Sequence, residues 1–118
     1  MFLVQVLVTG GAGFIGSNLV DRLVADGHAV RVFDDLSTGY AENVHPAAEL
    51  VVGDIADADA VRRAVAGSAV VFHQAAHRSV FRSVEAPQAT DRANVGGTLN
   101  VLVAAHEAGT RRVVSASS

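Results

Sequence analysis

A glycine-rich turn near the amino terminus, Gly10–Gly16, constrains the fold more than any other feature of this chain. It follows a short apolar run, Leu3–Val8, which predicts a buried strand, and it opens an amphipathic run, Ile15–Ala25, with apolar residues at helical spacing. Glycines let a backbone turn tightly and approach a ligand without a clash from a Cβ atom. Because the N–H groups and the dipole at a helix start attract phosphate, the sequence predicts a turn that binds the pyrophosphate of a dinucleotide.

The glycines of this turn fit two spacings. Gly11, Gly13 and Gly16 fit G-x-G-x-x-G, whereas Gly10, Gly13 and Gly16 fit the wider G-x-x-G-x-x-G. Glycine turns also serve simply to connect a strand with a helix, so the pattern alone leaves a purely structural turn open.

An acidic residue after the next apolar run supports the dinucleotide. The run Val30–Phe33 ends at Asp34, about 20 residues after the turn, which is the offset at which an acid receives the ribose hydroxyls. A carboxylate there repels a 2′-phosphate, and Asp35 adds a second negative charge with no Arg or Lys in the loop that follows. The alternative is that both residues merely begin a solvated turn. The sequence predicts a site that prefers NAD to NADP.

The composition of the chain limits the kinds of ligand and partner that it can bind. A chain of 118 residues predicts one domain, and the absence of cysteine excludes disulfides and thiolate metal sites. A net charge of −3 without a basic run makes nucleic acid and anionic membranes poor partners. The apolar runs are shorter than a membrane span. We therefore expect a cytoplasmic protein with no metal site.

The whole chain alternates segments of strand and helix character. The expected strands are Leu3–Val8, Ala29–Phe33, Leu50–Val52, Ala69–Phe72 and Arg112–Val114. The expected helices are Phe14–Asp26, Ala58–Ala66 and Ala89–Glu107, and the buried stripe of the first contains Ile15, Leu19, Val20, Leu23 and Val24. Such alternation implies parallel strands joined by right-handed crossovers. The predicted fold class is α/β, a doubly wound parallel sheet of the Rossmann type, truncated after the fifth strand.

In such a sheet the ligand lies beyond the carboxyl ends of the strands. Five segments fall at these ends: Gly10–Gly16, Asp34–Asp35, Gly53–Ile55, His73–His77 and Ser115–Ser118. Together they resemble the extended short-chain dehydrogenase/reductase superfamily, and within it the NAD-dependent sugar-nucleotide epimerases and dehydratases of the UDP-glucose 4-epimerase-like type. The resemblance implies NAD as cofactor, a nucleotide-sugar as substrate and transient hydride transfer from a sugar carbon to NAD. It covers the whole chain but only the first part of the family's length.

The resemblance also assigns residues. It favours the wider glycine spacing, brings the amides of Phe14 and Ile15 to the pyrophosphate, makes Asp34 the ribose acid, and has Asp54 and the next residue bracket the adenine. The cofactor-binding residues that it implies are Gly10, Gly13, Phe14, Ile15, Gly16, Asp34, Asp35, Ser37, Thr38, Gly39, Asp54, Ile55, Gln74, Ala75, Ala76, His77 and Asn94. By register Ser118 falls on the catalytic Ser/Thr position, where it would hydrogen-bond the reacting sugar oxygen.

One motif of the family is missing. Its members carry Tyr-x-x-x-Lys on the helix after the fifth strand, where the tyrosine moves a proton and the lysine lowers the tyrosine pKa. This chain stops at Ser118, its only tyrosine is Tyr40, and it has no lysine. Losing an acid–base partner costs about 10²–10⁴-fold in rate. We expect an incomplete NAD-binding domain over residues 1–118, without its substrate domain and inactive alone; a non-catalytic NAD-sensing regulatory module and a structural fragment whose site no longer closes are the alternatives.

Several polar residues have a second interpretation. His73 and His77 are four apart, a zinc-pair spacing on a helix, but His73 ends a strand and is expected to pack at the end of the sheet. We expect Arg78 and Arg82 either to bind the phosphates of a sugar nucleotide or to lie in a loop exposed to solvent. Asn94 faces the cofactor or the solvent, and Asn100 is expected at the surface. The serines near the carboxyl terminus lack the G-x-S-x-G pattern of a hydrolase.

The predicted helix Ala89–Glu107 resembles the family element that builds a dimer interface together with the next helix. Without that partner the helix leaves apolar surface uncovered. We therefore expect a homodimer or self-association through residues 89–107.

Overall fold

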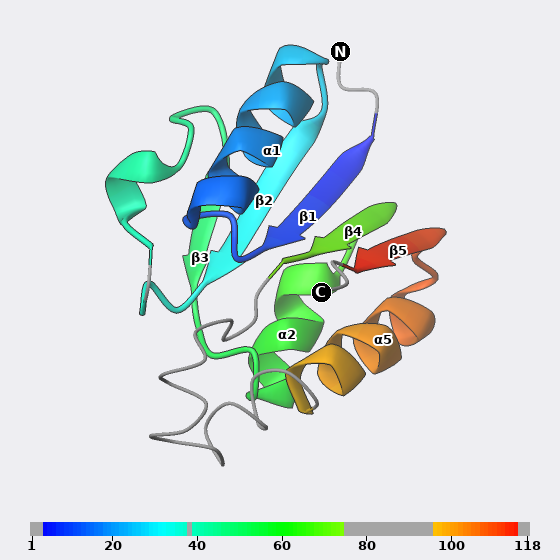
Figure 1. The fold of residues 1–118 in the computed structure, drawn as a ribbon. Helices are drawn as coiled ribbons and strands as arrows, with labels where there is room; N and C mark the ends of the chain where they lie inside the picture. Colours follow the sequence, from blue (N-terminus) through cyan, green and yellow to red (C-terminus); the bar gives the residue numbers. More distant parts are fainter. Residues whose placement is uncertain (1–3, 38, 75–95, 116–118) are drawn as a thin grey trace.

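The computed structural model describes residues 4–37, 39–74 and 96–115. Its elements in chain order are β1 (Gln5–Thr9), α1 (Phe14–Ala25), β2 (Ala29–Asp34), the 3-10 turn η1 (Ala41–Asn43), β3 (Glu49–Val52), α2 (Ala58–Val65), β4 (Val70–His73), α5 (Gly97–Ala108) and β5 (Arg112–Ser115). The five strands form one parallel sheet in the order β3-β2-β1-β4-β5 (Figure 1). The predicted α/β class, a doubly wound parallel sheet of the Rossmann type, is confirmed.

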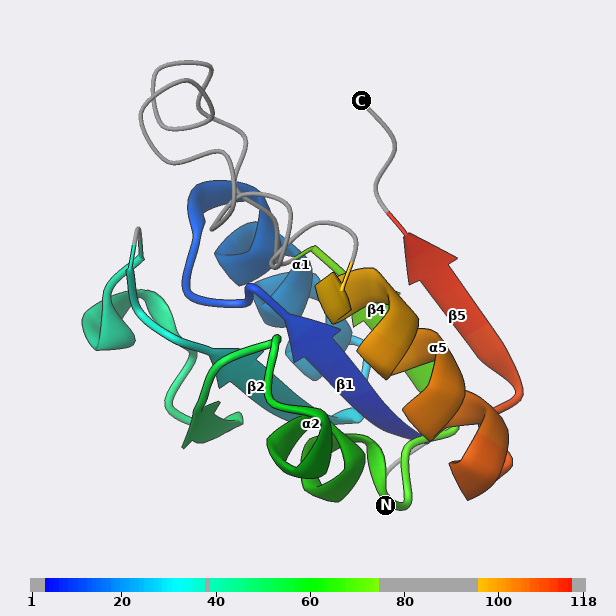
Figure 2. The same ribbon diagram turned by 90° about the horizontal axis from the view of Figure 1, so that it is seen from below.

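Helices cover both faces of the sheet. Helix α1 lies on one face, and α2 and α5 lie side by side on the other (Figures 1 and 2). Successive side chains of each strand point to opposite faces of the sheet, so each strand contributes residues to the core on both sides. Towards α1 the core holds Val6, Val8, Val20, Leu23, Val30 and Val32. Towards α2 and α5 it holds Leu7, Phe33, Ile55, Val61, Ala64, Val65, Val71, Val101, Ala104 and Ala105.

Four strands run one residue further than their apolar runs predict. They end on Thr9, Asp34, His73 and Ser115, which continue the parallel ladder because backbone hydrogen bonds do not depend on side-chain polarity. These polar residues therefore belong to the rigid sheet instead of the loops after it.

The helix ends follow local chemistry. The side chain of Asp57 accepts hydrogen bonds from the amides of Asp59 and Ala60 and caps α2, as the sequence predicts. Gly109, with a φ of 73°, ends α5. The expected burial of Ile15 is wrong: its side chain is 55% exposed, because the first turn of α1 lies beside the glycine turn at the end of the sheet. No helix in the described parts of the chain is long and apolar enough to cross a bilayer.

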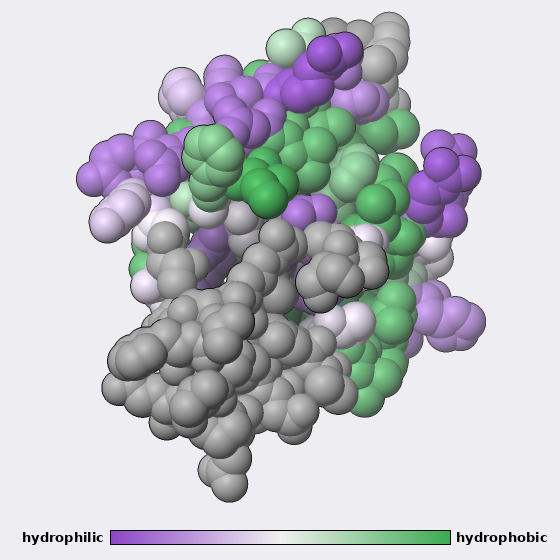
Figure 3. Space-filling view, in the orientation of Figure 1, coloured by the Kyte–Doolittle hydropathy of each residue, from purple (hydrophilic) through white to green (hydrophobic). Residues whose placement is uncertain are grey.

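Helix α5 has two dissimilar faces. Its inner residues Val101, Ala104 and Ala105 are buried against α2 and the sheet. On the outer side three large apolar residues remain exposed by roughly half: Leu99, Leu102 and Val103. Figure 3 shows apolar surface at the lower right, where Figure 1 places this helix. The amino-terminal part of the expected helix, residues 89–95, lies outside the described residues.

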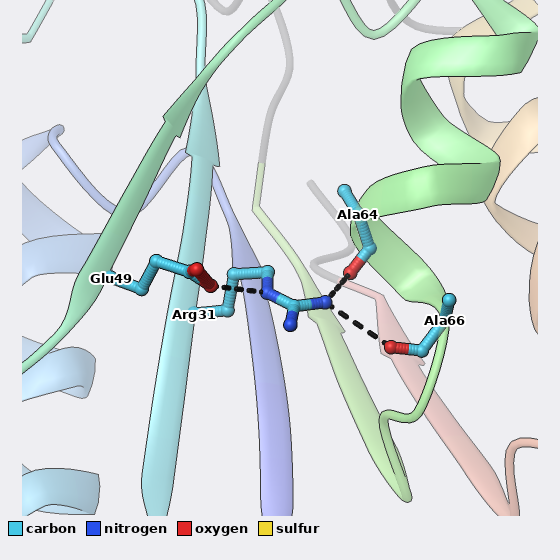
Figure 4. Close-up of polar contacts among 4 residues, drawn as sticks. All are labelled: Arg31, Glu49, Ala64 and Ala66. Atoms are coloured by element: carbon cyan, nitrogen blue, oxygen red, sulfur yellow. Dashed lines mark hydrogen bonds and ion pairs between the residues drawn. The ribbon is translucent and has the colours of Figure 1, made fainter.

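A single arginine joins three elements away from the glycine turn (Figure 4). The Nε of Arg31 on β2 donates to Glu49 Oε1 at 2.7 Å on β3. Its Nη1 donates to the carbonyl oxygens of Ala64 and Ala66 at 2.8 and 3.1 Å, at the end of α2. The cation also suits the negative end of the helix dipole, so this contact fixes α2 against the edge of the sheet.

The substitution Arg31→Met keeps the aliphatic stem but leaves both carbonyls and Glu49 without their donor. We expect the free energy of unfolding, measured by urea denaturation, to fall by about 1–3 kcal/mol. The control is Arg22→Met, which removes the exposed i,i+4 pair with Asp26 and should change the stability by no more than about 0.5 kcal/mol. Equal losses in the two variants would contradict the anchoring role of Arg31.

Candidate functional site

The two glycine spacings in the turn are reconciled by geometry. Gly10 has a φ of 75°, which L side chains rarely adopt, and its amide donates to the carbonyl of Phe33 at 2.8 Å. Gly11 has no room for a side chain, since a Cβ there would lie 2.6 Å from a methyl carbon of Val32. Both neighbouring glycines are therefore required, Gly10 for its conformation and Gly11 for its packing.

The other glycines of the turn differ in what they permit. A Cβ on Gly16 would collide with the carbonyl of Gly10, so the helix can approach the turn only with glycine there. A Cβ on Gly13 would meet only the same carbonyl oxygen, at an ordinary 3.5 Å. Packing thus requires glycine at position 16 but not at position 13.

The start of α1 presents unpaired amides. Gly13 is its N-cap and makes no side-chain cap. The first amide bonded back to the cap is that of Ser17, which donates to the Gly13 carbonyl at 2.8 Å. Among the described residues none accepts from the amides of Phe14 and Ile15, as is usual for the first turn of a helix. These two donors and the helix dipole could hold an anion at the carboxyl edge of the sheet.

Asp34 is buried at the end of β2, with 9% of its surface exposed. Its Oδ2 accepts from the amide of Ala12 in the glycine turn at 2.9 Å, and its Oδ1 accepts from the amide of Leu36 at 2.8 Å. Each oxygen keeps a further lone pair for another donor. By contrast Asp35 is exposed and, among the described residues, accepts only from the amide of Ser37, at 2.9 Å, so of the two acids Asp35 alone fits the solvated-turn alternative.

The loop after β2 is fastened to the same turn. The carbonyl of Ala12 accepts from the amide of Tyr40 at 3.4 Å and from the Nδ2 of Asn43 at 3.2 Å. Gly39 lies so close to Ala12 that a Cβ would collide with its carbonyl. The Ala12 residue therefore joins the glycine turn both to Asp34 and to this loop.

The next strand end contributes Asp54 and Ile55. Asp54 is exposed, and its Oδ1 accepts from the amide of Ala56 at 2.8 Å. Ile55 is buried, and its carbonyl accepts from the Nδ2 of Asn100 on α5 at 3.0 Å. The expectation that Asn100 lies at the surface is therefore wrong. Helical spacing offered the missing signal, because Asn100 follows Gly97 by three residues and precedes Ala104 by four on the buried face.

His73 lies at the end of β4, as expected, and is 6% exposed. Its Nδ1 is 2.7 Å from the Oγ1 of Thr9 on β1, and its Nε2 is 3.0 Å from the Oγ1 of Thr98 on α5. The amide of Gln74 donates to the same Thr9 hydroxyl at 3.0 Å. Burial lowers the pKa of His73 below its ordinary value of 6.5, which keeps the ring neutral at pH 7.

Some predicted site residues lie outside the described residues: Thr38, Ala75, Ala76, His77, Asn94 and Ser118, together with Arg78 and Arg82. Within the described parts of the chain no three His, Asp or Glu side chains gather as metal ligands would. The described site thus consists of the glycine turn, the first turn of α1, and the ends of β2, β3 and β4.

The lowered pKa of His73 predicts the direction in which the stability of the fold changes with pH. The unfolded chain binds the proton more readily than the folded one, so stability from this residue is complete above pH 6.5 and is lost as the pH falls below it. Urea unfolding at several values from about pH 8 to about pH 5 should show a steeper acid loss for the wild type than for His73→Gln. Parallel curves for the two proteins would contradict this prediction.

Comparison with known proteins gives the site its context. The model of the NAD dependent epimerase/dehydratase family matches residues 6–118. A UDP-glucose 4-epimerase of Mycolicibacterium smegmatis is 52% identical over 97% of this chain and 38% of its own length. A 3 beta-hydroxysteroid dehydrogenase/Delta 5-->4-isomerase of Mycobacterium tuberculosis is 44% identical over 97% of this chain and 31% of its own. The chain thus spans only about a third of the length of these relatives.

Solved structures agree in fold. The UDP-glucose 4-epimerase of Thermus thermophilus in complex with NAD superposes with a TM-score of 0.86 at 42% identity, over 92% of this chain and 36% of that one. The enzyme of Thermotoga maritima with UDP-glucose reaches a TM-score of 0.93 at 37% identity, over 97% of this chain and 38% of that one. With its glycine turn, its buried strand-end acid and these matches, the chain belongs to the NAD-dependent epimerase/dehydratase family.

Proposed function

We propose that this chain is the NAD-binding portion of a sugar-nucleotide epimerase or dehydratase of the UDP-glucose 4-epimerase type. The observation that carries the proposal is the Asp34 carboxylate, buried at the end of β2 and bonded to the glycine turn through the amide of Ala12. A ribose acid and a phosphate turn are held in one unit, as a dinucleotide requires. The match to epimerases over nearly the whole chain supports the same assignment.

Each part of the site suits one part of the cofactor. The free amides of Phe14 and Ile15 suit the pyrophosphate, and the spare lone pairs of Asp34 suit the hydroxyls of the adenosine ribose. The exposed Asp54 and the amide of Ile55 suit the edge of the adenine. Asp34 and Asp35 together oppose a 2′-phosphate, which favours NAD over NADP.

Gly13 supplies an independent argument for a ligand. Packing requires Gly16 to lack a side chain, but it leaves ordinary space for a Cβ at Gly13. A glycine that the fold does not need lies between the turn and the free amides of α1, where a ligand phosphate would approach the backbone.

The proposed reaction also needs a nucleotide-sugar. NAD bound here would accept a hydride from a sugar carbon of the nucleotide-sugar and later return it. In this proposal the chain's own residues bind and orient that cofactor, and Ser118, by its register with the family motif, would hydrogen-bond the sugar oxygen. The sequence holds no lysine, and Tyr40 is exposed in the loop after β2. We therefore propose that the 118 residues bind NAD but do not epimerise a sugar by themselves.

The relatives named as 3 beta-hydroxysteroid dehydrogenases favour a second candidate. Their match over 97% of this chain fits an NAD-binding portion that serves oxidation of a secondary alcohol on a different substrate. Both candidates share the cofactor site. Assay of the whole protein with UDP-glucose and with a 3β-hydroxysteroid separates them, since only one substrate should turn over.

The binding test uses isothermal titration with NAD and with NADP. We expect NAD to bind more tightly, and Gly13→Ala to weaken NAD binding by about tenfold or more because the methyl group hinders phosphate approach. The melting temperature of this variant should stay near that of the wild type, since its Cβ has ordinary space. Tighter binding of NADP, or no binding of either dinucleotide, would refute the proposal.

The exposed face of α5 supports the proposed self-association. Leu99, Leu102 and Val103 leave about half of each side chain in water on one helix. Burying such a surface against a second copy removes apolar area from water. We therefore propose a homodimer, or weaker self-association, through this face.

Sedimentation velocity at increasing concentration tests this assembly. Wild type should show a rising mass, whereas Leu102→Asp should stay monomeric because a charge on the face opposes its burial. The control Ala25→Asp adds the same charge to an exposed position on α1, on the opposite side of the sheet, and should associate like the wild type. A monomeric wild type at high concentration would contradict the proposal.

A further inference from the structure

Asn100 is the polar member of an otherwise apolar helix face. It lies half-buried on α5 between Gly97 and Ala104, and its Nδ2 donates to the carbonyl of Ile55 at 3.0 Å. Gly97 brings the helix close to the same residue, since a Cβ there would lie 2.7 Å from a methyl carbon of Ile55. Two successive turns of α5 thus hold Ile55, one by contact and one by a hydrogen bond.

The bond from Asn100 reaches further than Ile55. The carbonyl that it holds and the amide of Ala56 belong to one planar peptide unit, so fixing the oxygen also directs the N–H. That N–H donates to Asp54 Oδ1 at 2.8 Å. Asn100, the peptide between Ile55 and Ala56, and the Asp54 carboxylate therefore form one connected series of hydrogen bonds.

The carboxylate at the end of this series is exposed and fixed through one oxygen. No described residue accepts from the amide of Ile55, so the segment offers one acceptor, the carboxylate, beside one donor. An adenine edge presents the complementary pair, a 6-amino donor beside the N1 acceptor, whereas hypoxanthine presents a carbonyl beside an N–H. A correctly turned Asp54 would therefore distinguish adenine from hypoxanthine.

We infer that Asn100 is a positioning residue for base recognition: by holding the peptide after Ile55 it sets the Asp54 carboxylate to accept the 6-amino group of adenine. The inference rests on the proposed NAD site and adds to it the residue that fixes its adenine end. Asn100 itself touches no ligand in this role and acts only through the peptide and Asp54.

The experiment measures binding of NAD and of nicotinamide hypoxanthine dinucleotide by isothermal titration. Wild type should prefer NAD, and Asn100→Ala should lose about tenfold in that preference, the fold-change expected when one hydrogen bond is lost. Affinity for the hypoxanthine analogue should stay nearly constant. Asn100→Gln, which keeps the amide, should recover part of the preference.

A matched control separates positioning from stability. The Oγ1 of Thr110 donates to the carbonyl of Ser68 at 2.9 Å, just after α5 and at the amino edge of the sheet, away from Asp54. Thr110→Val removes a side-chain-to-carbonyl bond of the same kind, so it should lower the melting temperature without changing the preference for NAD.

The outcomes are distinct. Unchanged preference in Asn100→Ala, with NAD still bound, overturns the role of Asn100 and leaves the proposed function intact. No NAD binding by the wild type overturns both. If circular dichroism shows that the alanine variant is unfolded, Asn100→Ser takes its place, because its hydroxyl is too short to reach the carbonyl of Ile55. Its affinity for NAD relative to the hypoxanthine analogue is then measured in the same way. Loss of the preference in Asn100→Ala but not in Thr110→Val supports the inference.

Discussion

The rest of the site depends on the hydrogen bonds that Asp34 makes with the backbone. A carboxylate with 9% of its surface exposed is costly to keep charged unless donors surround it, and the amides of Ala12 and Leu36 are those donors. The bonds tie the end of β2 to the glycine turn and to the loop that follows. The carbonyl of Ala12 then receives Tyr40 and Asn43, so three backbone segments share one residue. The turn is held in shape by its neighbours rather than by its own glycines alone.

Most of the fold could be predicted from the sequence because its determinants are local. Short, mainly apolar runs, helical spacing between them, and caps at Asp57 and Gly109 identify the elements, and alternation identifies the parallel sheet. The strand ends were predicted one residue short, since the expectation followed hydrophobicity while the ladder continues through Asp34 and His73. The exposure of Ile15 was missed because a helical stripe does not reveal which turn lies over the strands.

The site was less accessible to sequence reasoning because its contacts join distant residues. Asn100 and Ile55 are 45 positions apart, and Thr9 and His73 are 64 apart, so no local pattern indicates that either pair meets. Asp34 was found because its offset from the glycine turn reflects a recurring strand–turn–helix unit. Even there, the spacing predicts a ribose acid but gives no sign that the acid also fastens Ala12.

Helix α5 carries the His73 and Ile55 contacts on one side and uncovered leucines on the other. A helix moves nearly as a rigid body, so a small roll or slide imposed on its outer side must displace Thr98 and Asn100 by a comparable amount. The proposed self-association through this face and the proposed binding of NAD would then be thermodynamically linked, each changing the equilibrium constant of the other by the same factor. In such a protein, saturation with NAD would change the dissociation constant of the dimer, and dilution of the protein would change its affinity for NAD. Both measurements would give the same coupling free energy.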